Sequence, residues 1–259
     1  MKAAEMFNLN GRVALVTGAS SGLGTQFAKA LADNGAAVAL VARRADRLKA
    51  LQREIEGKGG KAIAVEADVT DRAAVSRAFD AAEKAFGTVT VLVNNAGIAQ
   101  SASRAIEVTE EEWRKVLGLD LDAVFYNAQE AARRMLAAGK KGAIINIASV
   151  LGFGVAKGVA AYATAKAGVV QMTRALGVEL AFKGVRVNAI APGWFVTEIN
   201  DKYLTGEAGD ALKRAIPTGR FGNVGDLDGA LLLLASDAGA YITGATIVVD
   251  GGQVVMISG

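Results

Sequence analysis

The sequence contains no cysteine and no histidine in its 259 residues. Without them the chain forms no disulfide, offers no thiolate nucleophile and builds no Ser-His-Asp triad. The usual nitrogen and sulfur ligands of metal ions are also missing, so we expect no metal site. Any acid–base chemistry must therefore come from Tyr, Lys, Asp or Glu side chains.

Proline is scarce, and long apolar or strongly charged runs are missing. Two prolines and no low-complexity stretch give no sign of a linker or repeat, so we expect one domain over residues 1–259. The 29 basic and 26 acidic residues are scattered, which disfavours a nucleic-acid surface. No stretch approaches the ~18 apolar residues that span a membrane. Met1 to Arg12 lacks an apolar signal-peptide core, so we expect a cytoplasmic protein without membrane partners.

Short runs rich in Val, Ile and Ala alternate with longer segments of helical period, a pattern typical of β-α-β units on a parallel sheet. We predict strands near 12–17, 37–42, 61–66, 89–94, 142–148, 185–190 and 246–250. We predict helices near 22–34, 44–56, 71–86, 109–138, 161–183, 198–214 and 225–236. The predicted fold is α/β, a doubly wound, Rossmann-type parallel sheet of seven strands. Its ligands should bind at the carboxyl ends of the strands, where the loops at 18–24, 42–44, 94–98, 149–161 and 191–217 would share one cleft.

Tyr162 and Lys166 are four residues apart and therefore lie on one face of the predicted helix, one turn from each other. An ammonium beside a phenol favours the phenolate, which turns a weak base into a usable one. Ser149 ends the preceding predicted strand and can meet Tyr162 over one substrate oxygen. The alternative is a Tyr and a Lys on the wet side of an amphipathic helix, but small residues surround both, as in a buried helix.

The segment after the first predicted strand reads Gly18-Ala19-Ser20-Ser21-Gly22-Leu23-Gly24. Glycines at a strand-to-helix turn let the backbone approach a pyrophosphate, whose charge the helix N-terminus then meets. The second predicted strand ends in Arg43-Arg44 instead of the acid that would bind a ribose 2′-hydroxyl. Two guanidinium groups suit a 2′-phosphate, so we expect NADP(H), with NAD(H) use left open. Alternatively, Arg43 and Arg44 only begin the next helix and lie in solvent without binding a phosphate.

Together these motifs carry a family resemblance. Ser149, Tyr162-x-x-x-Lys166, Thr17-Gly18-x-x-x-Gly22-x-Gly24 and Asn94-Asn95-Ala96-Gly97 occur in the order and spacing of a short-chain dehydrogenase/reductase. The likeness runs from Val13 to Gly252 and implies a cofactor half over about 1–140 and a catalytic half over about 141–259. It implies that Tyr162 exchanges a proton with the substrate, that Ser149 binds the substrate oxygen, and that Lys166 also holds the nicotinamide ribose.

The resemblance assigns further contacts. The implied cofactor-binding residues are Gly18, Ser20, Ser21, Gly22, Leu23, Gly24, Arg43, Arg44, Asp68, Val69, Asn95, Ala96, Gly97, Tyr162, Lys166, Pro192, Gly193 and Thr197. Asp68 and Asn94 also fit structural roles as a cap and as a partner for backbone groups. Asp120 stands where the family usually has asparagine, which helps hold a water near the lysine. Asp120 could do the same through its backbone carbonyl, or its extra charge could alter the lysine and the pH optimum, and we include it among the catalytic residues.

Apolar residues near these motifs form the predicted substrate pocket, although aromatic residues are more often core than substrate contacts. Besides Ser149, the predicted substrate-binding residues are Val150, Phe153, Val155, Trp194, Phe195 and Tyr203. We expect residues 198–217 to form a lid over the substrate.

Several functions fit these residues. The leading hypothesis is an NADP-dependent reductase of small ketones or dehydrogenase of secondary alcohols. The start of the chain at 6–12 and the turn at 193–198 resemble the gluconate 5-dehydrogenase branch, which suggests a polyol or sugar acid as substrate. Few charged residues in the predicted pocket could bind a carboxylate, which weakens this alternative. A 3-oxoacyl thioester reductase, with Arg133, Arg134, Lys140 and Lys141 docking an acidic carrier, is an alternative. A catalytically silent nucleotide-sensing scaffold is another. The resemblance also implies a homotetramer formed through the helices at 109–138 and 161–183 and through the C-terminal strand region.

Overall fold

Seven short strands between two layers of helices form the centre of the protein. A computed structural model describes residues 2–100, 102–197, 204 and 206–256. The strands are β1 (Val13–Thr17), β2 (Ala37–Ala42), β3 (Lys61–Glu66), β4 (Val91–Asn94), β5 (Gly142–Ile147), β6 (Val185–Pro192) and β7 (Thr246–Val249). All pair in parallel in the order β3-β2-β1-β4-β5-β6-β7. This confirms the predicted fold class and all seven predicted strands.

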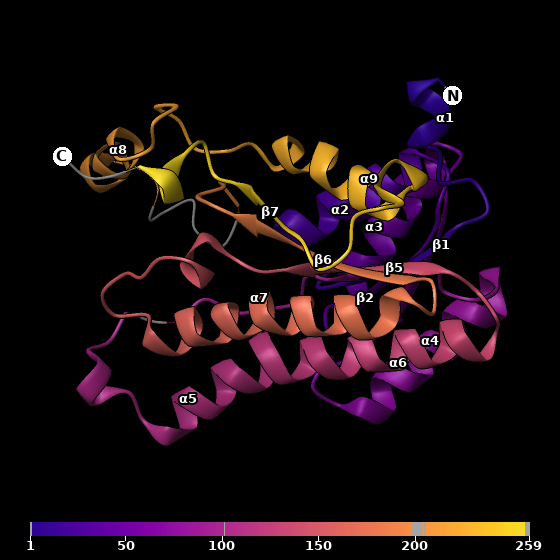
Figure 1. The fold of residues 1–259 in the computed structure, drawn as a ribbon, viewed down its shortest axis with the longest axis horizontal. Coiled ribbons are helices and arrows are strands. Elements are labelled where there is room, and N and C mark those ends of the chain that lie inside the picture. The colour runs from indigo at the N-terminus through magenta and orange to yellow at the C-terminus, as the bar shows by residue number, and fades with distance from the viewer. Residues whose placement is uncertain (1, 101, 198–203, 205, 257–259) are drawn as a thin grey trace.

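Helices cover both faces of this sheet. The α-helices in the described part of the chain are α1 (Ala3–Met6), α2 (Gly22–Asp33), α3 (Ala45–Gly57), α4 (Arg72–Phe86), α5 (Glu110–Leu117), α6 (Ala123–Ala137), α7 (Ala160–Ala181), α8 (Gly206–Arg214) and α9 (Asp228–Ala235). Figure 1 shows α2, α3 and α9 on one face and α4, α6 and α7 on the other. Within the described residues, no helix combines the length and apolar character needed to cross a membrane.

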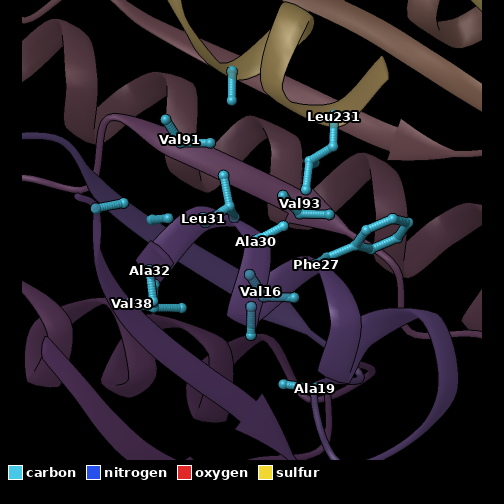
Figure 2. Close-up of a cluster of buried hydrophobic side chains, with 14 of the residues drawn as sticks. Val16, Ala19, Phe27, Ala30, Leu31, Ala32, Val38, Val91, Val93 and Leu231 are labelled. Carbon is cyan, nitrogen blue, oxygen red and sulfur yellow. The ribbon is translucent and has the colours of Figure 1, made fainter. Parts of the chain in front are cut away.

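One hydrophobic core lies between α2, α9 and the sheet. Figure 2 shows the Phe27 ring and Leu231 beside Val16 and Val93 of the neighbouring strands β1 and β4. Phe27 and Leu231 are both 0% exposed. Because strands of a doubly wound sheet are covered on both faces, they read as continuous apolar runs, which is why they could be predicted from the sequence.

The helix predicted over 109–138 is not a regular α-helix. Thr109 caps its start by accepting a hydrogen bond from the Glu112 amide, as expected for a threonine at this position. A π-helical turn over Gly118–Asp122 then separates α5 from α6, although helical dihedral angles continue through it. A π turn inserts one residue into a helix and often marks a functional site. Here it carries Asp120.

The two remaining predicted helices are shorter than expected. The helix predicted over 198–214 is present as α8, and residues 198–203 and 205 lie outside the described residues. The helix predicted over 225–236 begins with a 3-10 turn, Val224–Leu227, and continues as α9. This second difference concerns only the helix type of the first turn, because the 3-10 turn and α9 remain in contact.

Candidate active site

A cleft of about 980 Å³ lies where six of the seven strands end. Each of the five loops expected to share a cleft contributes to its wall, through residues such as Gly18, Arg44, Gly97, Ser149 and Gly193. The segments 67–70 and 114–120 complete the lining. Parallel strands bring their carboxyl ends to one edge of the sheet, so residues far apart in sequence meet there.

The glycine turn after β1 is packed so tightly that larger residues cannot replace its glycines. Gly18 has φ of 68°, and a Cβ placed on it would lie 2.8 Å from the Asn95 amide nitrogen and 2.9 Å from the Ala96 Cα. A Cβ on Gly24 would meet the Gly18 carbonyl oxygen. The turn therefore brings bare backbone to the cleft, and this geometry fits a pyrophosphate group.

The start of α2 presents its amides to the same part of the cleft. Ser21 precedes the helix, but its side chain accepts no hydrogen bond from the helix amides. The Arg44 guanidinium instead donates to the hydroxyls of Ser20 at 2.9 Å and Ser21 at 2.7 Å. A cation thus stands beside a helix N-terminus, an arrangement suited to a phosphate.

Arg43 lies on the other side of this region, near Asp68. The Asp68 carboxylate accepts hydrogen bonds from the amide and hydroxyl of Thr70, at 2.9 Å and 2.7 Å. These bonds, with a smaller contribution from Arg43, hold the pKa of Asp68 below its usual range. Asp68 therefore has the turn-capping role weighed from the sequence and also lies in the cleft wall.

The Asn-Asn-Ala-Gly segment is tied into the sheet. Asn94 donates to the Asn146 side chain at 3.0 Å, across the β4–β5 register, and to the Val124 carbonyl at 3.1 Å. The Asn95 and Ala96 amides both donate to the Thr17 hydroxyl at 3.0 Å. Thr17 was not among the predicted site residues, yet it fixes the backbone that lines the cleft.

Ser149, Tyr162 and Lys166 all line this cleft. Ser149 follows β5, is 8% exposed, and its Oγ accepts from the Leu151 amide at 3.1 Å. Lys166 is 4% exposed; its Nζ lies 5.5 Å from the centroid of the Tyr162 ring and donates to the Ile147 carbonyl at 3.1 Å. The structure thus brings together the three residues predicted to carry the chemistry.

Asp120 forms a buried ion pair with Lys166. Its Oδ1 lies 3.3 Å from Lys166 Nζ, and both carboxylate oxygens accept from the Ile98 amide at 3.3 Å. A Cβ on Gly97 would collide with Asp120 Oδ1, so glycine there makes room for the carboxylate. Burial raises the pKa of Asp120, and Lys166 and the Ile98 amide oppose that rise.

The predicted substrate-binding residues have different surroundings. Phe153 is 44% exposed and Val155 is 90% exposed, whereas Val150 and Phe195 are buried at 7% and 5%. Phe195 belongs to the main core and also borders the cleft. Trp194 packs in a small cluster with Leu204, Leu212, Ile216 and Phe221. Tyr203 lies outside the described residues, as does most of the start of the expected lid at 198–217.

Gln100 was missed by the sequence reasoning. Its Oε1 accepts a hydrogen bond from the Tyr162 backbone amide at 3.1 Å, and the residue is only 8% exposed. The contact joins residues 62 positions apart, so no local pattern announces it. Only its position shortly after Gly97 indicated that it lies near the site.

Comparisons with known proteins decide the family. A family model described as enoyl-(acyl carrier protein) reductase matches residues 18–253. The D-threitol dehydrogenase of Mycolicibacterium smegmatis is 42% identical over 249 residues, covering 96% of this chain and 95% of that protein. The chain belongs to the short-chain dehydrogenase/reductase family. It is therefore an oxidoreductase of the class that acts on alcohol and ketone groups.

Other relatives of this short-chain dehydrogenase/reductase support the same family assignment. The gluconate 5-dehydrogenase of Gluconobacter oxydans is 37% identical, covering 98% of both chains. The crystal structure of a gluconate 5-dehydrogenase from Burkholderia cenocepacia, in complex with NADP and tartrate, has a TM-score of 0.93 and 36% identity. The similarity extends over 99% of this chain and 100% of that chain. The predicted family resemblance is confirmed.

Proposed function

We propose that this chain is an NADP(H)-dependent oxidoreductase that interconverts a small ketone and its secondary alcohol. The observation that carries the proposal is a buried lysine, Lys166, 5.5 Å from the Tyr162 ring and at the wall of a cleft that Ser149 also lines. A phenol paired with a buried cation is suited to proton exchange. A protein that only binds nucleotide needs no such combination.

The chain's own residues would handle the proton and orient the substrate. Tyr162 would take a proton from the alcohol in oxidation and return one to the alkoxide in reduction. Lys166, held by the Ile147 carbonyl and Asp120, would favour the phenolate. Ser149 Oγ accepts from the Leu151 amide, which leaves its hydroxyl hydrogen to donate to the substrate oxygen.

The cleft also supports the proposed cofactor residues. We propose that the pyrophosphate binds at the glycine turn and α2 start, and the 2′-phosphate of NADP(H) near Arg44 and Arg43. When bound, the nicotinamide supplies or accepts the hydride of the reaction. The proposed contacts are Gly18, Ser20, Ser21, Gly22, Leu23, Gly24, Arg43, Arg44, Asp68, Val69, Asn95, Ala96, Gly97, Tyr162, Lys166, Pro192, Gly193 and Thr197. We further propose that the domain consists of a cofactor half, about 1–140, and a catalytic half, about 141–259, which also contributes some of these cofactor contacts.

A polyol or sugar acid is the second candidate substrate, because relatives 37% and 42% identical are named for gluconate and threitol. The thioester alternative also has a named relative, the 3-oxoacyl-[acyl-carrier-protein] reductase of Thermotoga maritima, which is 38% identical, but the residues expected to dock the carrier support it less. Arg134, expected to help dock an acidic carrier, is bound to Asp80, Glu83 and Glu130 at 2.7 to 2.8 Å. Lys140 and Lys141 precede β5, at the end of the sheet opposite to the cleft.

We also propose a homotetramer in the cytoplasm, where a nicotinamide cofactor is in steady supply. Apolar side chains stand in solvent on the outer helices: Val178 of α7 is 78% exposed, Phe182 at its end is 100% exposed, and Tyr126 of α6 is 39% exposed. Such residues gain by being covered. Light scattering should give four times the chain mass, and a monomeric mass would contradict this.

The proposed function is tested by following oxidation of NADPH and NADH with aryl ketones, diketones, 5-ketogluconate and acetoacetyl thioesters. Turnover with NADPH on a ketone supports it, and a thioester preference would replace it. Tyr162→Phe should lower kcat about a thousandfold while cofactor binding persists. Tyr241→Phe is the control, because this tyrosine is fully exposed. A Tyr162→Phe variant with unchanged function would indicate the nucleotide-sensing scaffold.

A further inference from the structure

The loop after β4 is bonded to both members of the Tyr-Lys pair. At one end, the Ile98 amide donates to the Asp120 carboxylate, which lies 3.3 Å from Lys166 Nζ. At the other end, Gln100 Oε1 accepts from the Tyr162 amide at 3.1 Å. Residues 97–99, which follow β4 and precede Gln100, line the cleft. The same short segment therefore touches the cleft and supports both side chains.

The bond to Gln100 satisfies a donor at the start of α7. The helix begins at Ala160, and Val159 occupies the N-cap position, where an apolar side chain accepts no hydrogen bond. The Tyr162 amide is the third of the first-turn amides, which have no partner within a helix. Gln100, 8% exposed, supplies the missing acceptor from a different part of the chain.

The two members of the pair are anchored unequally. Lys166 is 4% exposed, one turn inside the helix, and held by both the Ile147 carbonyl and Asp120. Tyr162 lies in the first turn, and first turns fray more readily than helix interiors. Tyr162 therefore depends more than Lys166 on an external anchor.

We propose that Gln100 is a positioning residue that fixes the first turn of α7 and so holds Tyr162 beside Lys166. This inference rests on the proposed function, in which Tyr162 exchanges the substrate proton. Gln100 acts through the Tyr162 backbone and carries out no chemical step.

The Gln100 side chain uses only its acceptor. Its Nε2 is buried and has no hydrogen-bond partner among the residues that the structure describes, which is an unfavourable arrangement for a donor. A glutamate of the same length keeps the acceptor, has no donor to leave unpaired, and places its charge at the positive end of the α7 dipole. A methionine of similar length removes the acceptor. The pair of variants therefore separates the hydrogen bond from the volume of the side chain.

The test compares Gln100→Met and Gln100→Glu with a control, Gln171→Met, at an exposed position of α7. Hydrogen exchange of residues 159–166 is measured without cofactor, and kcat and KM are measured with NADPH and a ketone. We expect Gln100→Met to speed exchange of the Tyr162 amide and to lower kcat about fivefold, with the KM for NADPH unchanged. Gln171→Met should resemble the wild type in both measurements, and Gln100→Glu, which keeps the acceptor, should resemble it in the exchange of the Tyr162 amide.

Wild-type exchange and kcat in Gln100→Met would overturn the inference while leaving the proposed function intact. A lower melting temperature with unchanged kcat in the folded enzyme would also overturn it, because that result indicates only a structural role. If the wild type turns over no ketone, the proposed function fails, and the exchange rates still decide whether Gln100 anchors Tyr162. If Gln100→Met does not fold, Gln100→Asn, whose amide is one methylene too short, replaces it.

Discussion

Replacing Asp120 with asparagine tests how the buried ion pair tunes the proposed base. Asparagine keeps the shape of the side chain and one acceptor oxygen but removes the charge 3.3 Å from Lys166 Nζ. With 5.5 Å from Nζ to the Tyr162 ring, the carboxylate lies within about 9 Å of that ring. Two unit charges at this distance interact by roughly 1.8 kcal/mol at an effective dielectric constant of about 20.

The carboxylate opposes a negative charge on Tyr162, and oxidation of an alcohol needs that charge. The value of kcat/KM for oxidation should therefore fall on the acid side, with a midpoint that moves to lower pH when the carboxylate is removed. The interaction above corresponds to a gain of roughly twentyfold in kcat/KM on the acid side. The assay is kcat/KM against pH for the wild type, Asp120→Asn and Asp122→Asn. Asp122 is the control, because it belongs to the same π turn but is exposed, where solvent screens its charge.

The same substitution changes stability in a direction set by the raised pKa of Asp120. A carboxyl whose pKa is higher in the folded state than in the unfolded state loses stability as the pH rises from its ordinary value through the raised one. The stability of the wild type relative to Asp120→Asn should therefore fall as the pH rises from about 4, and urea denaturation at several pH values measures this trend. An acid limb that stays in place or moves to higher pH in Asp120→Asn alone would refute the electrostatic reasoning.

Two further variants probe the cofactor end and the outer layer. Arg44→Ala should raise the KM for NADPH about tenfold with little change for NADH, because a charge-assisted hydrogen bond to the 2′-phosphate is lost; equal changes for both cofactors would contradict that role. Arg134→Met should lower the free energy of unfolding by about 2 kcal/mol, because three carboxylates lose their cation. Urea denaturation measures this, and kcat should stay at the wild-type value; a drop in kcat would show that the network reaches the site.

The strands and the reactive side chains could be predicted because each leaves a local pattern. Strands such as β1 and β5 are buried on both faces and therefore appear as apolar runs. Tyr162 and Lys166 share a helix face because of the helical period alone. The parallel sheet then brings the loops after β4 and β5 to one edge, since these strands are neighbours. The fold class, the position of the cleft and the meeting of Tyr162 and Lys166 at its wall all follow from patterns of this kind.

The features that adjust the site leave no such pattern. The π turn over Gly118–Asp122 lies inside a segment with helical period, and one extra residue in a turn does not alter that period enough to be seen. Trp194 looked like a pocket residue, but whether an aromatic side chain in a loop faces substrate or core depends on neighbours such as Phe221. Such contacts join distant segments and require the folded chain.

Asp120 shows how the two kinds of information combine. Its identity as an acid in the place of an asparagine was visible in the sequence, and so was the expectation that its charge would affect the lysine. What the fold adds is that the carboxylate is fully buried, that Gly97 leaves room for it, and that the Ile98 amide and Lys166 share it. Because burial raises the cost of an uncompensated charge, the carboxylate and the ammonium stabilise each other in place. Removing the carboxylate in Asp120→Asn should therefore change the surroundings of Lys166 as well as those of Tyr162.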